Sequence, residues 1–223
     1  DLFMTKYPKF LIIHSRDSAY SGSGQPWRDS NFDNFELCIK YLASINIGVV
    51  RISRIAVTSY LDCENLLDLS QLQQATLYDQ LFLMRNASYI VGTGSGISHW
   101  HCLNPCPMLF INTLVMHPTP FIESVLVSPK RSTRNHSLLL NSPNVESFST
   151  CWSYYFIENT SPRELTQTEI LSDVRFLIES YEYSQSFPTL RQTLSDLNIS
   201  TQHIFDTYIT PSYRDFLISS LSL

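Results

Sequence analysis

The chain has 223 residues, of which 43% are hydrophobic, 16% charged and 13% aromatic, and its formal net charge is -5. The apolar share is typical of a globular protein, which excludes intrinsic disorder, and the length suits one core but not two full Rossmann domains. With 15 Lys and Arg against 20 Asp and Glu, the chain lacks the basic surface of a nonspecific nucleic-acid-binding protein, so no nucleic-acid partner is expected.

Cysteine usage and hydropathy indicate a cytoplasmic protein, either free or at the inner face of the membrane. The five cysteines include no Cys-x-x-Cys pair and fit neither a zinc ribbon nor a disulfide framework. No apolar run approaches the roughly 18 residues that a membrane span needs, and the first residues do not resemble a signal peptide. Because position 1 is Asp rather than Met, we expect a piece of a longer protein.

Short apolar runs alternate with amphipathic segments in the first half of the chain. A buried strand is predicted over residues 10–14. Apolar residues at helical spacing from Phe32 onward predict a helix, with Asp33 and Glu36 in a capping box at its start and Gly48 at its end. Residues 54–75 are predicted to be irregular. The remaining elements are a strand over residues 49–52, a helix from Thr76 to about Ala87 opened by a Thr76 and Asp79 capping box, and a strand over residues 89–91.

The same alternation continues in the second half. A helix is predicted over residues 97–103, with strands over residues 108–111, 125–127 and 154–157. Ser161-Pro162-Arg163-Glu164 predicts the start of a helix that runs to about Tyr181, followed by a tail that is helical in pieces with a break at Pro211. This pattern predicts an α/β fold, a Rossmann-like parallel sheet with flanking helices. Residues 1–160 would form one Rossmann-like domain, and residues 161–223 the C-terminal helices packing on it.

Polar residues follow three of the predicted strands, and in a parallel sheet these positions share one edge. They are His14, Arg16 and Asp17 after the first strand, Arg51 in the second, and Thr93, Gly94, Ser95 and Gly96 after the third. The glycine loop at a helix start offers backbone N–H groups to a phosphate, and the arginines offer positive charge. A bound diphosphate is therefore predicted.

Each of these residues also has a purely structural explanation. Ser95 could be only a helix cap, and His14 a hydrogen-bonded structural histidine. Arg51 could be a solvated residue at the sheet rim, and Asp79 is expected to cap its helix in a structural role. His99 and His101 would point to opposite sides of a helix, so no metal site is expected. A nucleophile elbow, a dinucleotide fingerprint and a Walker lysine are not matched by the sequence.

Together these residues resemble a known family. The order His14-Ser15-Arg16-Asp17, Arg28, Asn31, Arg51, Asp79, Gly92 to Gly96 and Asn112 resembles bacterial glycosyltransferases of surface-polysaccharide clusters. The His-x-Arg segment and Ser95-Gly96-Ile97-Ser98-His99-Trp100 are also similar to the donor-binding segments of GDP-fucose-using fucosyltransferases. Asp17 replaces the second arginine of the fucosyltransferase motif.

The resemblance implies the C-terminal, donor-binding half of a GT-B fold, with the N-terminal acceptor domain missing or supplied by a second subunit. It implies a metal-independent enzyme that transfers a sugar from a GDP- or UDP-linked donor to a glycan or lipid-linked acceptor hydroxyl. His14, Arg16, Arg51 and residues 93–96 would bind the donor. The general base would lie on the absent domain or be Asp17, and the isolated chain is expected to be inactive. A non-catalytic sugar-nucleotide-binding remnant and a nucleotide-sugar epimerase remain as alternatives.

Overall fold

The fold was analysed in a computed structural model. It describes residues 2–16, 29–53, 62–72, 74–93, 104, 106–112, 125–131, 162–182, 192, 195–196 and 208–221. Four predictions from the sequence lie outside these residues: the helix over 97–103, the strand over 154–157, the candidate base Asp17 and the loop Gly94 to Gly96.

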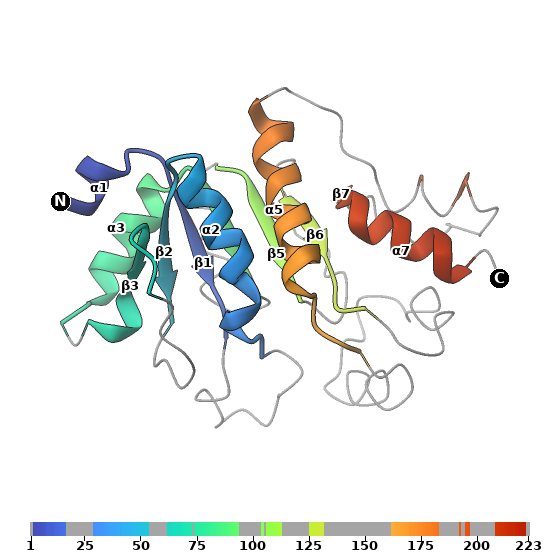
Figure 1. Ribbon diagram of the computed structural model, residues 1–223, viewed down its shortest axis with the longest axis horizontal. Coiled ribbons are helices and arrows are strands. Elements are labelled where there is room, and N and C mark those ends of the chain that lie inside the picture. The colour runs from blue at the N-terminus through green and yellow to red at the C-terminus, as the bar shows by residue number, and fades with distance from the viewer. Residues whose placement is uncertain are drawn as a thin grey trace.

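The centre of the molecule is a seven-stranded sheet in which all neighbouring strands run parallel (Figure 1). The strand order is β3-β2-β1-β4-β5-β6-β7. The strands are β1 (Phe10–His14), β2 (Gly48–Ile52), β3 (Leu66–Asp68), β4 (Tyr89–Gly92), β5 (Met108–Ile111), β6 (Val125–Ser128) and β7 (Tyr208–Ile209). The predicted Rossmann-like parallel sheet is confirmed, and so are its five predicted strands within the described residues.

The order of the strands places β1 at the point where the direction of winding reverses. The chain passes from β1 outward through β2 to β3, then returns to β4 on the other side of β1 and continues outward to β7. In open α/β sheets, ligands bind at the carboxyl ends of the strands on either side of such a switch point. The neighbouring ends of β1 and β4 are therefore the first place to look for a site.

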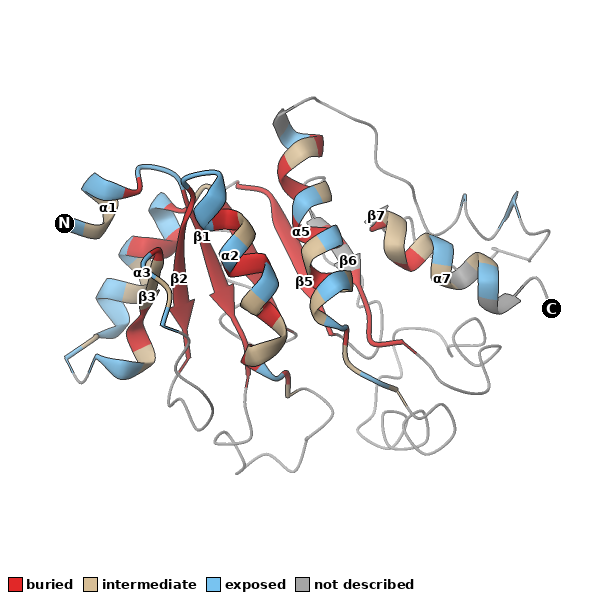
Figure 2. Ribbon diagram, viewed as in Figure 1, coloured by how far each residue is buried: buried red, intermediate tan, exposed pale blue. Residues whose placement is uncertain are grey.

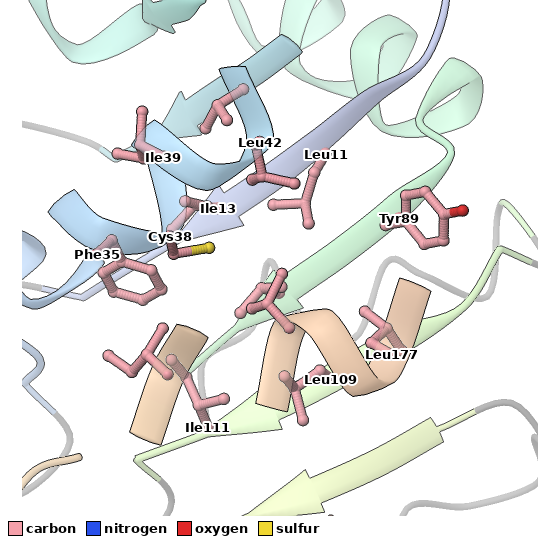
Figure 3. Packing of buried hydrophobic residues seen from close by; sticks show 14 of the residues in the cluster. Leu11, Ile13, Phe35, Cys38, Ile39, Leu42, Tyr89, Leu109, Ile111 and Leu177 are labelled. Atoms are coloured by element: carbon pink, nitrogen blue, oxygen red, sulfur yellow. The ribbon is translucent and has the colours of Figure 1, made fainter. Parts of the chain in front are cut away.

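The central strands β1, β2, β4 and β5 are buried on both faces, and Figure 2 shows β1, β2 and β5 in red. Successive side chains of a strand point to opposite faces, so Leu11 and Ile13 belong to one apolar cluster, and Phe10 and Ile12 to another. The first cluster is covered by α2 (Glu36–Ser44) and α5 (Gln167–Glu182), and Figure 3 shows its interior. The second is covered by α3 (Leu77–Asn86) and by Phe3 and Met4 of α1 (Leu2–Lys6).

The first covering helix begins and ends differently from the prediction. A 3₁₀ turn, η3 (Phe32–Phe35), comes first, and the Asn31 side chain caps it by accepting from the Asp33 N–H. The helix ends at Ser44, and Asn46 takes a positive φ of 56° in the turn that follows. Gly48 does not end the helix. It is the first residue of β2, where a Cβ atom would lie 2.7 Å from Cβ of Tyr7.

The segment predicted to be irregular contains an edge strand. Residues 66–68 form β3, and the short 3₁₀ turn η4 (Leu69–Gln71) follows. Just before this strand, the Asn65 side chain donates to the carbonyl oxygens of Ile39 and Ile47. These two bonds fix the register at which so short a strand joins the sheet.

The helix start predicted at Ser161 to Glu164 is wrong. Arg163 is extended instead, because its backbone exchanges hydrogen bonds with the backbone of Arg131, at N···O distances of 3.0 and 2.8 Å. The capping interaction forms between Thr166 and Glu169, and α5 begins at Gln167. Two successive Ser/Thr-x-x-Glu patterns, at residues 161–164 and 166–169, could each start a helix, and the bridge to Arg131 keeps the first one extended.

The C-terminal part is not purely helical, which corrects the expected tail of helices. Tyr208 and Ile209 add the edge strand β7 beside β6. The break predicted at Pro211 is confirmed as a helix start, since α7 runs from Pro211 to Leu221 and packs against α5. Within the described part of the chain, no helix combines the length and apolar character that a bilayer span requires.

Candidate functional site at the switch point

The ends of β1 and β4 are joined at the switch point by two hydrogen bonds that surround Thr93. The backbone N–H of Thr93 donates to the carbonyl of His14 over 3.0 Å, and its Oγ1 accepts from the backbone N–H of Arg16 over 3.2 Å. All three residues are buried. The structure thus brings together His14, Arg16 and Thr93, which the sequence had predicted to share a site.

His14 is a neutral imidazole at this edge. Its side chain is buried, and burial lowers its pKa to about 4. At neutral pH it therefore contributes hydrogen-bonding capacity and no charge. A positive charge for an anionic ligand has to come from its neighbours.

Arg16 supplies such a charge and is held in place by Asp29. The Nε of Arg16 lies 3.3 Å from Oδ1 of Asp29. The backbone carbonyl of Arg16 accepts from the backbone N–H of Ser30 over 2.7 Å. Arg16 as a whole residue is only 7% exposed. A carboxylate beside Nε orients the planar guanidinium, whose Nη groups are the ones that make paired bonds to phosphate or carboxylate oxygens. Asp29 was not predicted from the sequence.

The segment 29–31 is held over the strand ends by residues that are distant in the sequence. Asn112 Nδ2 donates to Ser30 Oγ over 2.7 Å, and the backbone N–H of Asn31 donates to Glu164 Oε2 over 2.9 Å. Lys130 Nζ donates to the carbonyl of Asp29 over 3.0 Å. The ends of β5 and β6 are thereby connected to the residue that orients Arg16.

Asn112 connects two segments with one amide group. It follows β5 in the left-handed conformation, with a φ of 52°, and is buried. While its Nδ2 binds Ser30, its Oδ1 accepts from the backbone N–H of Leu165 over 2.8 Å. The sequence singled out Asn112 only through the family resemblance and gave it no role. Lys130 and Glu164 were missed, because no local pattern links them to a residue more than 100 positions away.

The structure places Arg51 of β2 in a buried ion pair, and its part in donor binding stays a prediction. In the sheet register Arg51 pairs with Ile13, so its side chain lies on the face covered by η3 and α2. There it is fully buried, with Nη1 3.0 Å from Oδ2 of Asp68 and its guanidinium 3.9 Å from the ring centre of Phe32. The alternative of a solvated rim residue is wrong, because Arg51 is fully buried.

Asp79 caps α3, as expected from the sequence. Its carboxylate accepts from the N–H and hydroxyl of Thr76, and these hydrogen bonds lower the pKa of Asp79. Asp79 also borders an apolar hollow of about 560 Å³ between α1, η4 and α3, lined among others by Phe3, Leu72 and Phe82. This hollow lies over the second apolar cluster and contains none of the residues of the switch point.

The remaining predicted donor-binding residues, Gly94, Ser95 and Gly96, lie outside the described residues, and so does Asp17. Among the side chains that the structure describes, no three His, Cys, Asp or Glu residues lie close enough to hold a metal ion.

Comparison with known proteins yields similarity of fold only. No family model and no curated protein matches the sequence. Among solved structures, the E. coli ADP-heptose LPS heptosyltransferase II is 13% identical, with a TM-score of 0.50 over 78% of this chain and 47% of that chain. The chain thus shares the Rossmann-like α/β fold of part of that protein, which has a GT-B fold.

Two further solved structures from E. coli are similar at lower scores. They are heptosyltransferase WaaC with ADP and the iron-containing dodecameric glycosyltransferase TibC. WaaC is 14% identical, with a TM-score of 0.43 over 81% of this chain and 46% of that chain. TibC is 15% identical, with a TM-score of 0.46 over 80% of this chain and 46% of that chain. The chain thus spans about half the length of the solved structures it matches.

Proposed function

We propose that this chain is the donor-binding half of a GT-B glycosyltransferase, which transfers a sugar from a nucleoside-diphosphate sugar to an acceptor hydroxyl. The observation that carries the proposal is the group His14, Arg16 and Thr93, joined by hydrogen bonds at the switch point of a parallel sheet. Ligands of open α/β folds bind at this place, and a buried, oriented arginine suits a phosphate.

Each residue has a defined part in this reaction. As the bond between the sugar and the diphosphate breaks, negative charge develops on the leaving diphosphate, and Arg16 stabilises it by hydrogen bonds and charge. Asp29 keeps the guanidinium in the right orientation. Residues 94–96 would add backbone N–H groups, as expected from the sequence. This stabilisation uses side chains and backbone, so the proposed mechanism does not call on a resident metal.

Three nucleotides are candidates for the donor, and two kinds of molecule for the acceptor. The sequence predicts a GDP- or UDP-linked donor, and the name of E. coli heptosyltransferase II adds an ADP-linked one. The acceptor would be a surface glycan or a lipid-linked precursor, bound by an acceptor domain in another part of the protein or on a second subunit. The domain with residues 1–160 would bind the donor, with 161–223 packed on it.

Calorimetric titration with ADP, GDP and UDP tests donor binding. We expect one of them to bind, and Arg16→Ala to weaken it by about tenfold to a hundredfold, the value of a charged hydrogen bond of about 1.5 to 3 kcal/mol. Arg175→Ala is the matched control, because Arg175 is an exposed arginine on α5 that pairs with Glu179. Failure of all three nucleotides to bind would contradict the proposal, and so would equal binding by Arg16→Ala.

Product analysis separates the remaining enzyme classes. Combined with an acceptor domain, a transferase yields a glycosylated acceptor and free nucleoside diphosphate, whereas an epimerase yields a sugar nucleotide of changed configuration. The 223-residue chain alone is expected to transfer no sugar, because a GT-B reaction needs donor and acceptor held in one cleft between two domains. Sugar transfer at ordinary turnover by this chain alone would refute that expectation.

A further inference from the structure

Lys130 is a buried lysine at the carboxyl end of β6. Its side chain is 7% exposed, and its Nζ donates to the carbonyl of Asp29 over 3.0 Å. The Glu164 carboxylate lies 3.8 Å from Nζ, beyond hydrogen-bond distance. An ammonium group has three N–H donors, so these contacts leave it capable of binding a further acceptor.

The electrostatic environment of Lys130 compensates its charge only in part. Burial lowers the pKa of Lys130, while the negative charges of Glu164 and Asp29 act in the opposite direction without cancelling the effect. A buried cation whose charge is only partly compensated is unfavourable in the protein, and a bound anion would relieve this.

Asp29 brings Lys130 and Arg16 to the same place. The carboxylate of Asp29 lies beside Nε of Arg16, and its carbonyl oxygen accepts from Lys130. In the sheet, β1 and β6 are separated by β4 and β5, a distance of about 14 Å at the usual strand spacing. Asp29 lies between the two strands and contacts both long side chains, so that the two cations approach the same residue.

We propose that Lys130 is a second phosphate-binding cation of the nucleotide site, which donates to an oxygen of the diphosphate that Arg16 also binds. This inference rests on the proposed function. The two side chains would have different roles. The planar guanidinium of Arg16 would fix the orientation of the phosphates, and the compact ammonium of Lys130 would add positive charge on their other side.

The test compares ligands that differ in phosphate number. Affinity for the nucleoside diphosphate that binds the wild-type chain, and for its parent nucleoside, is measured by calorimetry for Lys130→Met and Lys130→Arg. Lys40→Met is the matched control, because Lys40 is an exposed lysine paired with Glu36 on α2. We expect Lys130→Met to bind the diphosphate about tenfold more weakly and the nucleoside unchanged, and Lys130→Arg to recover most of the loss.

Three results overturn the inference. Unchanged diphosphate affinity of Lys130→Met, with binding lost in Arg16→Ala, removes Lys130 from the site and leaves the proposed function intact. An equal loss for nucleoside and diphosphate makes Lys130 a support of the segment 29–31 only. No binding of any nucleoside diphosphate by the wild-type chain overturns the proposed function itself.

Glu164→Gln keeps the test decisive if Lys130→Met does not fold. Glutamine retains an oxygen that can accept from the Asn31 N–H, but removes the negative charge near Lys130. If Lys130 binds the diphosphate, Glu164→Gln should tighten diphosphate binding by a fewfold and leave the nucleoside unchanged. Unchanged or weaker diphosphate binding would contradict the inference.

Discussion

The backbone N–H of Arg16 donates to Oγ1 of Thr93 and so joins the ends of β1 and β4 where the sheet changes its direction of winding. Both residues are buried. Thr93→Val keeps the shape and removes the acceptor, which leaves a buried N–H without this partner and is expected to cost about 1 to 3 kcal/mol of unfolding free energy. Urea unfolding measures this, with Thr93→Ser as the control that retains the hydroxyl. Equal stability of Thr93→Val and the wild type would show that the bond contributes nothing.

The buried pair Arg51 and Asp68 is expected to act on stability and not on donor binding. Asp68→Asn leaves the fully buried guanidinium without its carboxylate, which is expected to cost about 3 to 5 kcal/mol. The double variant Arg51→Met with Asp68→Leu should recover most of this loss, and its nucleotide affinity should equal that of the wild type. A folded Arg51→Met chain of unchanged stability that has lost nucleotide binding would return Arg51 to the donor site.

His14 is expected to make the fold sensitive to mild acid. Burial lowers the pKa of His14 to about 4, from an ordinary 6.5 in the unfolded chain. Below pH 6.5 the unfolded state therefore binds the proton first, and stability falls until about pH 4, by as much as about 3 kcal/mol. Urea unfolding at pH 7, 5.5 and 4.5 should show this slope, and His14→Phe should flatten it. An identical slope in His14→Phe would assign the acid sensitivity to other groups.

The start of α5 offers a test of the competition between two capping patterns. Thr166 caps the helix by accepting from the backbone N–H of Glu169, so Thr166→Ala is expected to destabilise the fold by about 1 kcal/mol. Ser172→Ala, at an exposed position inside α5, is the control. If Ser161→Ala lowered the free energy of unfolding more than Thr166→Ala does, the helix start predicted from the sequence at Ser161 would be the correct one.

The strands of the sheet could be predicted because they are buried on both faces. Their continuous apolar runs, such as residues 10–13 and 108–111, are typical of parallel strands and stand out in the sequence. The edge strands β3 and β7 are too short for such a signal. The register of β3 depends on Asn65, whose side chain reaches two carbonyl groups elsewhere in the chain, and local pattern reasoning does not detect such contacts.

From the sequence, only those residues of the candidate site that directly follow a predicted strand could be predicted. His14, Arg16 and Thr93 follow predicted strands, and parallel strands end at one edge, so their proximity follows from the fold class. Arg51 also lies near the end of its strand, but its side chain lies on the face covered by η3 and α2, where it contacts Asp68 and Phe32. Local patterns do not predict the contacts of Lys130 with Asp29 and Glu164, because these residues are far apart in the sequence. These contacts depend on the position of the segment 29–31 over the strand ends.

A crystal structure of the chain with the nucleoside diphosphate that binds it tests the central claim most directly. The account predicts that the diphosphate lies over the ends of β1 and β4, with phosphate oxygens within hydrogen-bond distance of the Arg16 guanidinium. A nucleotide bound elsewhere, for example in the apolar hollow beside Phe82, with the switch point unoccupied, would contradict it.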